Sequence, residues 1–216
     1  IAVIQYAVYI LLTRIGAGDI MKAAAAVCIP VLITGGIHLD GYMDMSDALY
    51  SYKAPEERLK ILKDPHIGAF AVISVITLVL ICFGAVHEII VSAGRDGMTV
   101  LCFSYVLSRI GSAMTVVTCR PAKKDGSLYT FAGNSEKKTV ILVLVFWLMI
   151  SGAGSIVLAG VPGMVMLLFT ALIYIMGVRT SYKALGGLTG DAAGWMLCRS
   201  ECISALAAAV AIHIVK

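Results

Sequence analysis

The sequence predicts an all-α fold, a polytopic membrane bundle of about six to seven transmembrane helices. Of its 216 residues, 60% are hydrophobic and only 14% are charged, and the mean hydropathy is +0.94. Soluble domains carry roughly 45–50% apolar and about 25% charged residues, so this chain has too few polar residues to cover a surface in water. The composition argues against a nucleic-acid-binding domain, a soluble nucleotide-binding enzyme and a secreted disulfide-rich scaffold.

Seven apolar stretches are the candidate crossings. Each is expected to be helical, because backbone groups inside lipid must find hydrogen-bond partners within the protein. At roughly 20 residues per crossing, they leave no room for a soluble domain, so residues 1–216 are expected to form one integral membrane domain. The first stretch starts inside an apolar run, and we expect that part of that crossing is cut off. The stretches are residues 1–12, 23–37, 68–91, 98–118, 139–159, 161–178 and 192–215.

The second stretch is short and ends at Gly35-Gly36. It is expected either to cross with a tilt or to be a broken helix. A second pair, Gly186-Gly187, also precedes a polar motif, where the chain is expected to leave a helix. Small residues that allow close helix packing explain the two pairs equally well.

Charged residues gather in the polar segments 38–67, 119–138 and 179–191, which lie on one side of the membrane if the seven crossings hold. Eleven of the seventeen Lys and Arg residues lie there, against four on the other side and two inside crossings. The positive-inside rule therefore predicts that all three segments are cytoplasmic loops of an inner-membrane protein. Nine of the thirteen acidic residues lie there too. Because the rule hardly responds to acids, the excess of carboxylates indicates a charged reaction site on this face.

The densest polar motif is GGIHLDGYMDMSDA at residues 35–48. Asp40, Asp44 and Asp47 stand at i, i+4 and i+7, so a helix would place them on one face, where like charges repel. Carboxylates that leave positions open for phosphate oxygens are typical of Mg²⁺ sites, and we predict one here; a solvated acidic turn is the alternative. His38 falls off this face, about 200° from Asp40. It is a candidate helix cap, supporting hydrogen-bond donor or phosphate ligand, or has a structural role only.

Two cationic segments are candidates for binding a polyanionic substrate. Residues 53–68 read KAPEERLKILKDPHIG, an amphipathic cytoplasmic helix followed by Lys63 and Asp64, the latter a possible further metal- or phosphate-site group. The loop that begins at Arg120 carries Lys123 and Lys124. Membrane topology alone also places cations in such a loop.

The segment GGLTGDAAG at residues 186–194 leads into the last crossing. Thr189, Gly190 and Asp191 stand where the start of a helix offers free N–H groups to a phosphate, although capping that helix is the role expected for one of Thr189 and Asp191. A charged group inside a crossing costs about 2.5–3.5 kcal/mol on insertion scales, so Arg109, Arg199 and Glu201 should each face a partner or a cavity. Arg109 is expected to meet a phosphate or carboxylate, or to form a structural ion pair.

In order and spacing, these motifs resemble the cobalamin synthase family of membrane-embedded adenosylcobinamide-GDP ribazoletransferases. The family pattern GGxHxDGxxDxxD is matched by residues 35–47, and its later GGxTGD segment by residues 186–191. A KDxxxG motif is met by residues 63–68, but Pro65-His66 stands where the family usually has Ser-Arg. This departure leaves an arginine-type phosphate contact at that point without support.

The resemblance implies that adenosylcobinamide-GDP and α-ribazole, or its 5′-phosphate, are joined to give adenosylcobalamin, or its phosphate, and GMP. Mg²⁺ held by Asp40, Asp44 and Asp47 would neutralise the diphosphate, and one of these aspartates or His38 would accept the hydroxyl proton. Membrane lipid is the expected surrounding partner and no nucleic acid is expected. An oligomer is possible, since the sequence leaves the oligomeric state open.

Two other classes share some of these features. A CDP-alcohol phosphotransferase also breaks a diphosphate with clustered aspartates and Mg²⁺, but its usual Ala-Arg is replaced here by Asp44-Met45. A small-solute transporter also uses broken helices and intramembrane charges. The acids of this chain, however, concentrate on one face of the membrane and not at its midplane.

Overall fold

The computed structural model describes residues 1–122 and 136–215 of the chain. The described residues form α-helices and contain no β-strand; one isolated β-bridge joins Pro121 and Leu188. The candidates Lys123 and Lys124 lie outside the described residues. The helices are α1 (Ala2–Arg14), α2 (Asp19–Thr34), α3 (Ile37–Tyr50), α4 (Pro55–Ile61), α5 (Ala69–Thr118), α7 (Lys137–Leu185) and α8 (Gly190–Val215).

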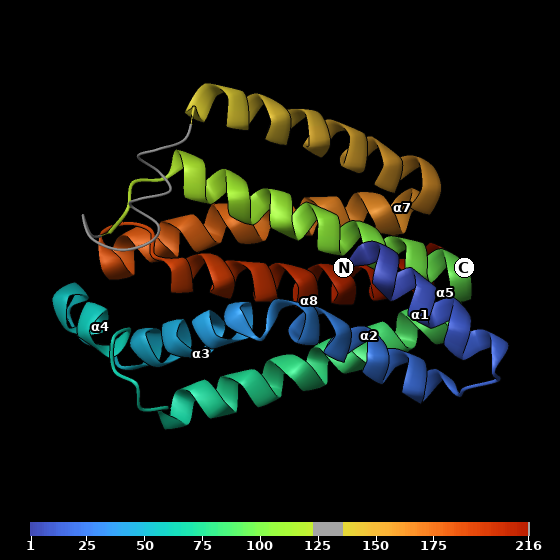
Figure 1. Ribbon diagram of the computed structural model, residues 1–216, viewed down its shortest axis with the longest axis horizontal. Coiled ribbons are helices and arrows are strands. Elements are labelled where there is room, and N and C mark those ends of the chain that lie inside the picture. Colours follow the sequence, from blue (N-terminus) through green and yellow to red (C-terminus); the bar gives the residue numbers. More distant parts are fainter. Residues whose placement is uncertain (123–135, 216) are drawn as a thin grey trace.

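The helices form an elongated bundle in which α8 runs between the others (Figure 1). By length and apolar composition, α5, α7 and α8 are membrane-span candidates, and α2 with α3 makes a fourth if that bent pair is one span. The fold class predicted from composition, a helical membrane bundle, is confirmed. The predicted count of six to seven crossings treats α5 and α7 as two helices each, and it includes α1, which at 13 residues is shorter than a span.

Both long helices are hairpins. In Figure 1, the first arm of α5 runs toward the end of the bundle where the C-terminus lies, and the second arm runs back; α7 repeats this course. The reversals occur at Gly94 (φ 53°, ψ −119°) and Gly160 (φ 58°, ψ −138°), which have backbone conformations that side chains disfavour. Each arm exceeds the roughly 20 residues that a crossing needs. The predicted stretches 68–91 and 98–118 are therefore the two arms of α5.

The turns themselves are tight and alike. An ideal Cβ at Gly97 would lie 2.6 Å from the carbonyl oxygen of Ile89, and one at Gly163 would collide with the carbonyl of Ser155. In both hairpins a glycine three residues after the reversal thus lets the second arm start against the backbone of the first. This spacing, Gly-x-x-Gly, explains why two crossings follow each other without a loop.

The described parts of the three polar segments meet at one end of the bundle. Leu188 N–H donates to the Arg120 carbonyl (2.9 Å), Ala122 N–H donates to the Leu188 carbonyl (2.8 Å), and the Arg120 side chain donates to the Gly186 carbonyl (3.0 Å). The helix α4 lies at the same end, against α7 (Figure 1). The predicted clustering of polar segments on one side is thus seen in the described residues, and we refer to this side as the polar end.

The break between α2 and α3 falls at the first glycine pair. Gly35 (φ 62°) and Gly36 (φ 80°) both adopt the left-handed conformation, and the axes of α2 and α3 differ by 92°. Of the two expectations for residues 23–37, the broken helix is the correct one. The bend starts α3 inside the bundle, from where it runs to the polar end (Figure 1).

A proline inside α2 is compensated by side chains from two other helices. Pro30 has no N–H, so the Ala26 carbonyl lacks its helical donor. The Gln5 side-chain amide (2.8 Å) and the Tyr105 hydroxyl (3.1 Å) both donate to that carbonyl. Because no water reaches a carbonyl in a dry interior, these donors tie α1 and α5 to α2.

We expect Gln5→Leu and Tyr105→Phe each to lower the free energy of unfolding by about 0.5–1.5 kcal/mol, because the other donor still satisfies Ala26. The double variant should lose more than the sum, since the Ala26 carbonyl is then buried without a donor. Unfolding titrations with a denaturing detergent in mixed micelles measure this. Tyr6→Phe is the control, because no hydrogen bond of the Tyr6 hydroxyl is found among the described residues. Strict additivity would contradict the compensation.

Candidate functional site

The helix α3 presents its three aspartates as the sequence predicts, on one face near the polar end. Asp40 is exposed, and Asp44 and Asp47 are partly buried, whereas Tyr42 and Met45 on the opposite face are buried in the core. The buried face packs on α8 and α5. The acidic face is therefore the outer face of a helix whose position the core fixes.

Two glycines bring the backbones of α3 and α8 into contact. An ideal Cβ at Gly41 would lie 2.9 Å from the Cα of Asp191, and one at Gly194 would lie 3.0 Å from the His38 carbonyl oxygen. The His38 carbonyl also accepts the Cys198 thiol hydrogen at 3.3 Å. This close contact places the GGLTGD segment beside the first motif, although nearly 140 residues separate them in the chain.

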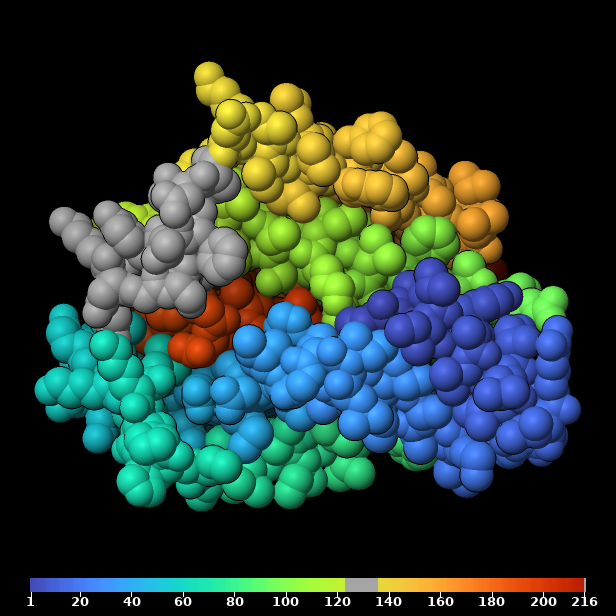
Figure 2. Space-filling model, viewed as in Figure 1, coloured from blue at the N-terminus to red at the C-terminus, as the bar shows by residue number. Residues whose placement is uncertain are grey.

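Four carboxylates consequently form one electrostatic group. The charges of Asp40, Asp191 and Asp47 all act on Asp44. Among the described residues, neither Asp40 nor Asp44 forms an ion pair with a cation. In Figure 2 the first turns of α8 lie at the bottom of a depression, between α3 and α4 on one side and the second arm of α5 on the other. The first turn of α8, which carries Asp191, thus lies at this depression near the polar end.

Asp47 has a structural task that the sequence did not indicate. Its carboxylate accepts the backbone N–H groups of Gly68 (2.7 Å) and Ala71 (2.8 Å), which are free at the start of α5. An ideal Cβ at Gly68 would lie 2.5 Å from this carboxylate, so a side chain at position 68 would displace it. Asp47 therefore joins the end of α3 to the beginning of the first arm of α5.

The KDxxxG motif, residues 63–68, forms a turn that is held by its own side chains. Asp64 accepts the His66 backbone N–H (3.0 Å), and its carboxylate lies 2.6 Å from His66 Nδ1. These two contacts lower the pKa of Asp64 below its usual value. Both side chains are exposed, as is Lys63 just before them. The Pro65-His66 departure from the family pattern thus supplies a partner for Asp64.

The segment before α8 has the geometry of a capped helix start. The Thr189 hydroxyl accepts the Ala192 N–H at 3.1 Å, so Thr189 is the cap and Asp191 lies in the first turn. Gly190 is exposed. The helix start, with Asp191 beside α3, faces the same end of the bundle as the acidic group.

Arg109 and Glu201, which the sequence placed inside crossings, are partners. The guanidinium donates from Nη1 to the Glu201 carboxylate, to the Ser108 hydroxyl (3.2 Å) and to the Tyr105 carbonyl (3.0 Å). Ser108 also donates to Glu201 at 2.9 Å. Of the two expectations for Arg109, a structural ion pair is thus present. In the described part of the chain, its Nε and Nη2 have no hydrogen-bond acceptor.

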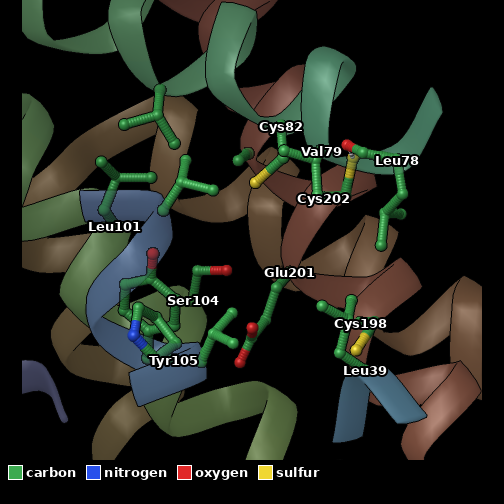
Figure 3. A pocket seen from close by; sticks show the side chains of 15 residues that line it. Leu39, Leu78, Val79, Cys82, Leu101, Ser104, Tyr105, Cys198, Glu201 and Cys202 are labelled. Carbon is green, nitrogen blue, oxygen red and sulfur yellow. Dashed lines mark hydrogen bonds between the residues drawn. The ribbon is translucent and has the colours of Figure 1, made fainter. Parts of the chain in front are cut away.

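Glu201 of this ion pair lines a cavity inside the bundle. A cavity of about 60 Å³ is bounded by α2, α3, α5 and α8, and Figure 3 shows Glu201 pointing into it between Tyr105 and Cys198. The charge of Arg109 also acts on the His38 ring. Glu201 therefore borders the cavity, and Arg109 lies near the start of α3.

The carboxylates of this site suit a hard cation such as Mg²⁺, but they do not surround it completely. No three His, Cys, Asp or Glu side chains of the described residues converge closely enough to hold a metal ion by themselves. Mg²⁺ is commonly bound through one or two carboxylates together with substrate phosphates and water. Asp40 and Asp44, which lack a cationic partner in the described part of the chain, meet this smaller requirement.

The residues that bring the parts of the site together were not recognised from the sequence. Gly41 and Gly194 allow the close contact of α3 and α8, and Ser108 bridges Arg109 and Glu201. Gly41 and Gly194 both lie in the motifs quoted above. A glycine in each of two expected helices could have indicated that the two helices pack closely against each other. No local signal marks Ser108.

Fold and site together define an integral membrane protein with an acidic site at one end of its helical bundle. The sequence model of the cobalamin-5-phosphate synthase family matches residues 1–209. The chain belongs to this family, as the resemblance predicted.

Several relatives are named adenosylcobinamide-GDP ribazoletransferase. The protein of Lachnoclostridium phytofermentans is 38% identical over 194 residues, which cover 90% of this chain and 73% of the relative. That of Clostridium botulinum (strain Alaska E43) is 38% identical over 202 residues, 93% and 78% of the two chains. That of Stutzerimonas stutzeri is 30% identical over 189 residues, 87% and 74%. No solved structure matches the chain. The predicted class, a transferase of late cobalamin synthesis, is confirmed.

Proposed function

We propose that this chain joins adenosylcobinamide-GDP to α-ribazole, or to its 5′-phosphate, with release of GMP. The family and the names of the relatives support the substrates. The observation that carries the proposal in this structure is the contact of α3 with the start of α8, which brings Asp191 into the electrostatic group around Asp44. This contact combines carboxylates with the start of a helix. Carboxylates can bind Mg²⁺ together with the phosphates of a diphosphate, and a helix start can bind phosphate oxygens directly.

The reaction that we propose is a phosphoryl transfer. A ribose hydroxyl oxygen of α-ribazole forms a bond to the phosphorus that carries cobinamide, and the bond between that same phosphorus and the bridging oxygen breaks. GMP leaves with the bridging oxygen, and the hydroxyl proton passes to a base on the protein. His38, Asp40 and Asp44 are the candidates for that base. Asp47 is a poorer one, because its oxygens already accept two backbone N–H groups.

Mg²⁺ is part of the proposal. Asp40 and Asp44 would hold it, with Asp191 and Asp47 close enough to add negative charge. When bound, the ion offsets the negative charge of the diphosphate and of the leaving GMP. Backbone N–H groups at the start of α8, from Thr189 through Gly190 to Asp191, would bind phosphate oxygens.

The remaining candidates have supporting roles in this proposal. Arg109 would bind a substrate anion through its Nε and Nη2, while Glu201 holds its Nη1 in place. Lys63, Lys123 and Lys124 would attract the polyanion, and Asp64 would hold the turn between α4 and α5 through His66. We place the polar end in the cytoplasm and the protein in the inner membrane, on the strength of the Lys and Arg distribution.

We expect GMP release from adenosylcobinamide-GDP plus α-ribazole to fall about a hundredfold or more when the purified protein is treated with EDTA, and to return when Mg²⁺ is added back. Chromatographic measurement of GMP checks this. Full turnover in EDTA would remove Mg²⁺ from the proposal and leave the transfer standing. CMP release from a CDP-alcohol, or solute flux without GMP, would instead contradict the transfer itself.

A further inference from the structure

Arg199 is a charged residue of α8 for which the proposed function has no use. Its guanidinium lies 4.4 Å from the ring centroid of Trp195, one turn earlier in the helix. Trp195 is only 6% exposed and packs in the core, so it is a fixed platform. In the described part of the chain, no carboxylate lies within ion-pair distance of Arg199. A cation inside a crossing thus has an aromatic partner and no counter-ion.

The side of α8 that carries Arg199 is partly exposed on the outside of the bundle; Arg199 itself is half-buried, and its charge also acts on Tyr42 of α3 and on Cys202. Ile203, Leu206 and Val210 follow at i+4, i+7 and i+11, which places all of them within about 40° of Arg199 on the helix. Leu206 is 42% and Val210 52% exposed on the outside of an apolar bundle. The face that meets α3, with Gly194 and Cys198, is turned about 100–140° away. Arg199 therefore stands at the end of an apolar stripe that lies nearer the polar end, and the far part of this stripe is exposed.

The depth of Arg199 suits a headgroup contact. Its Cα lies nine residues after the start of α8, about 14 Å along the helix. Helical side chains point toward the N-terminus, which for α8 is the polar end (Figure 1), and long cationic side chains extend to the interface in this way. Trp and Arg are common at this level of membrane proteins. The guanidinium is thus directed toward the phosphates of the leaflet at the polar end.

We infer that Arg199 and Trp195 form a binding site for the phosphate of an anionic phospholipid, whose acyl chains lie along Ile203, Leu206 and Val210. The guanidinium supplies several N–H donors to phosphate oxygens, and the lipid charge provides the counter-ion that the protein lacks. The stripe below supplies an apolar surface for the chains. This inference does not rest on the proposed function.

The test is retention of phosphatidylglycerol by the purified full chain. The wild type and Arg199→Gln are extracted from nanodiscs of phosphatidylcholine with or without phosphatidylglycerol, and bound lipid is counted by native mass spectrometry. We expect Arg199→Gln to retain about fivefold less phosphatidylglycerol, with phosphatidylcholine unchanged. Arg199→Lys should retain an intermediate amount, because it keeps the charge and loses the planar stack.

Arg179→Gln is the matched control, since Arg179 is an exposed arginine of α7 near the polar end and should leave retention unchanged. Thermal unfolding of all variants in phosphatidylcholine reports whether they are folded. If Arg199→Gln does not fold, the phosphatidylglycerol retained by Arg199→Lys is compared with that retained by Arg179→Lys, and this comparison decides. Equal retention by Arg199→Gln and wild type would overturn the site. An equal loss in Arg179→Gln would show attraction by net charge alone. Weaker GDP binding in lipid-free detergent, with lipid retention intact, would assign Arg199 to substrate instead.

Discussion

Asp44→Asn should reduce GMP release at least about a hundredfold while leaving the fold intact. Asparagine keeps the volume of the side chain and removes the charge that the proposal assigns to Mg²⁺. Among the described residues, Asp44 has no hydrogen-bond donor to lose, so no structural contact depends on it. The charges of Asp40, Asp191 and Asp47 act on it, so neutralising it relieves repulsion. In EDTA, the melting temperature of Asp44→Asn should equal or exceed that of the wild type.

This combination separates a site role from a structural one. A residue needed for packing loses activity and stability together, whereas Asp44→Asn should lose activity alone. Asp96→Asn is the control, because Asp96 is an exposed aspartate near the reversal of α5 at the opposite end of the bundle. Its turnover should match that of the wild type. Retained turnover in Asp44→Asn would remove this residue from the reaction.

The sequence predicted the helices well because the membrane imposes a length and a composition on each of them. The apolar stretches 98–118 and 192–215 end within a few residues of the observed helix ends. The paired crossings were predicted, but the sequence did not show that each pair reverses at a single glycine without a loop. What decides the reversal is the conformation of Gly94 and Gly160, together with contacts between backbones that no local pattern shows.

The candidate site was predictable as a set of residues, and less so as an arrangement. Helical spacing correctly placed Asp40, Asp44 and Asp47 on one face, because that property is local. It gave them equal roles, whereas Asp47 caps α5, a helix whose start lies 21 residues later. The pairing of Arg109 with Glu201 depends on how α5 and α8 pack, so the sequence left it as one of two alternatives.

Gly41→Ala should show how closely the reaction depends on the contact of α3 with α8. The added Cβ would lie 2.9 Å from the Asp191 Cα and 3.2 Å from its carbonyl oxygen, and since both are backbone atoms, a helix must shift. We expect the free energy of unfolding to fall by about 1–3 kcal/mol. Turnover should fall about 10- to 100-fold, because Asp44 and Asp191 move apart. Detergent unfolding and the GMP assay measure the two effects.

Gly84→Ala is the matched control, in the first arm of α5, where no neighbouring atom lies within 4 Å of the added Cβ. A helix interior without a clash favours alanine, so this variant should be more stable by about 0.5–1 kcal/mol and keep full turnover. If Gly41→Ala behaves like Gly84→Ala, the two helices have room to spare and the backbone contact does not set the distance between the carboxylates. If the turnover of Gly41→Ala falls while its stability is unchanged, the reaction tolerates less displacement of the carboxylates than the packing does. This is expected when several carboxylates must be positioned around one diphosphate.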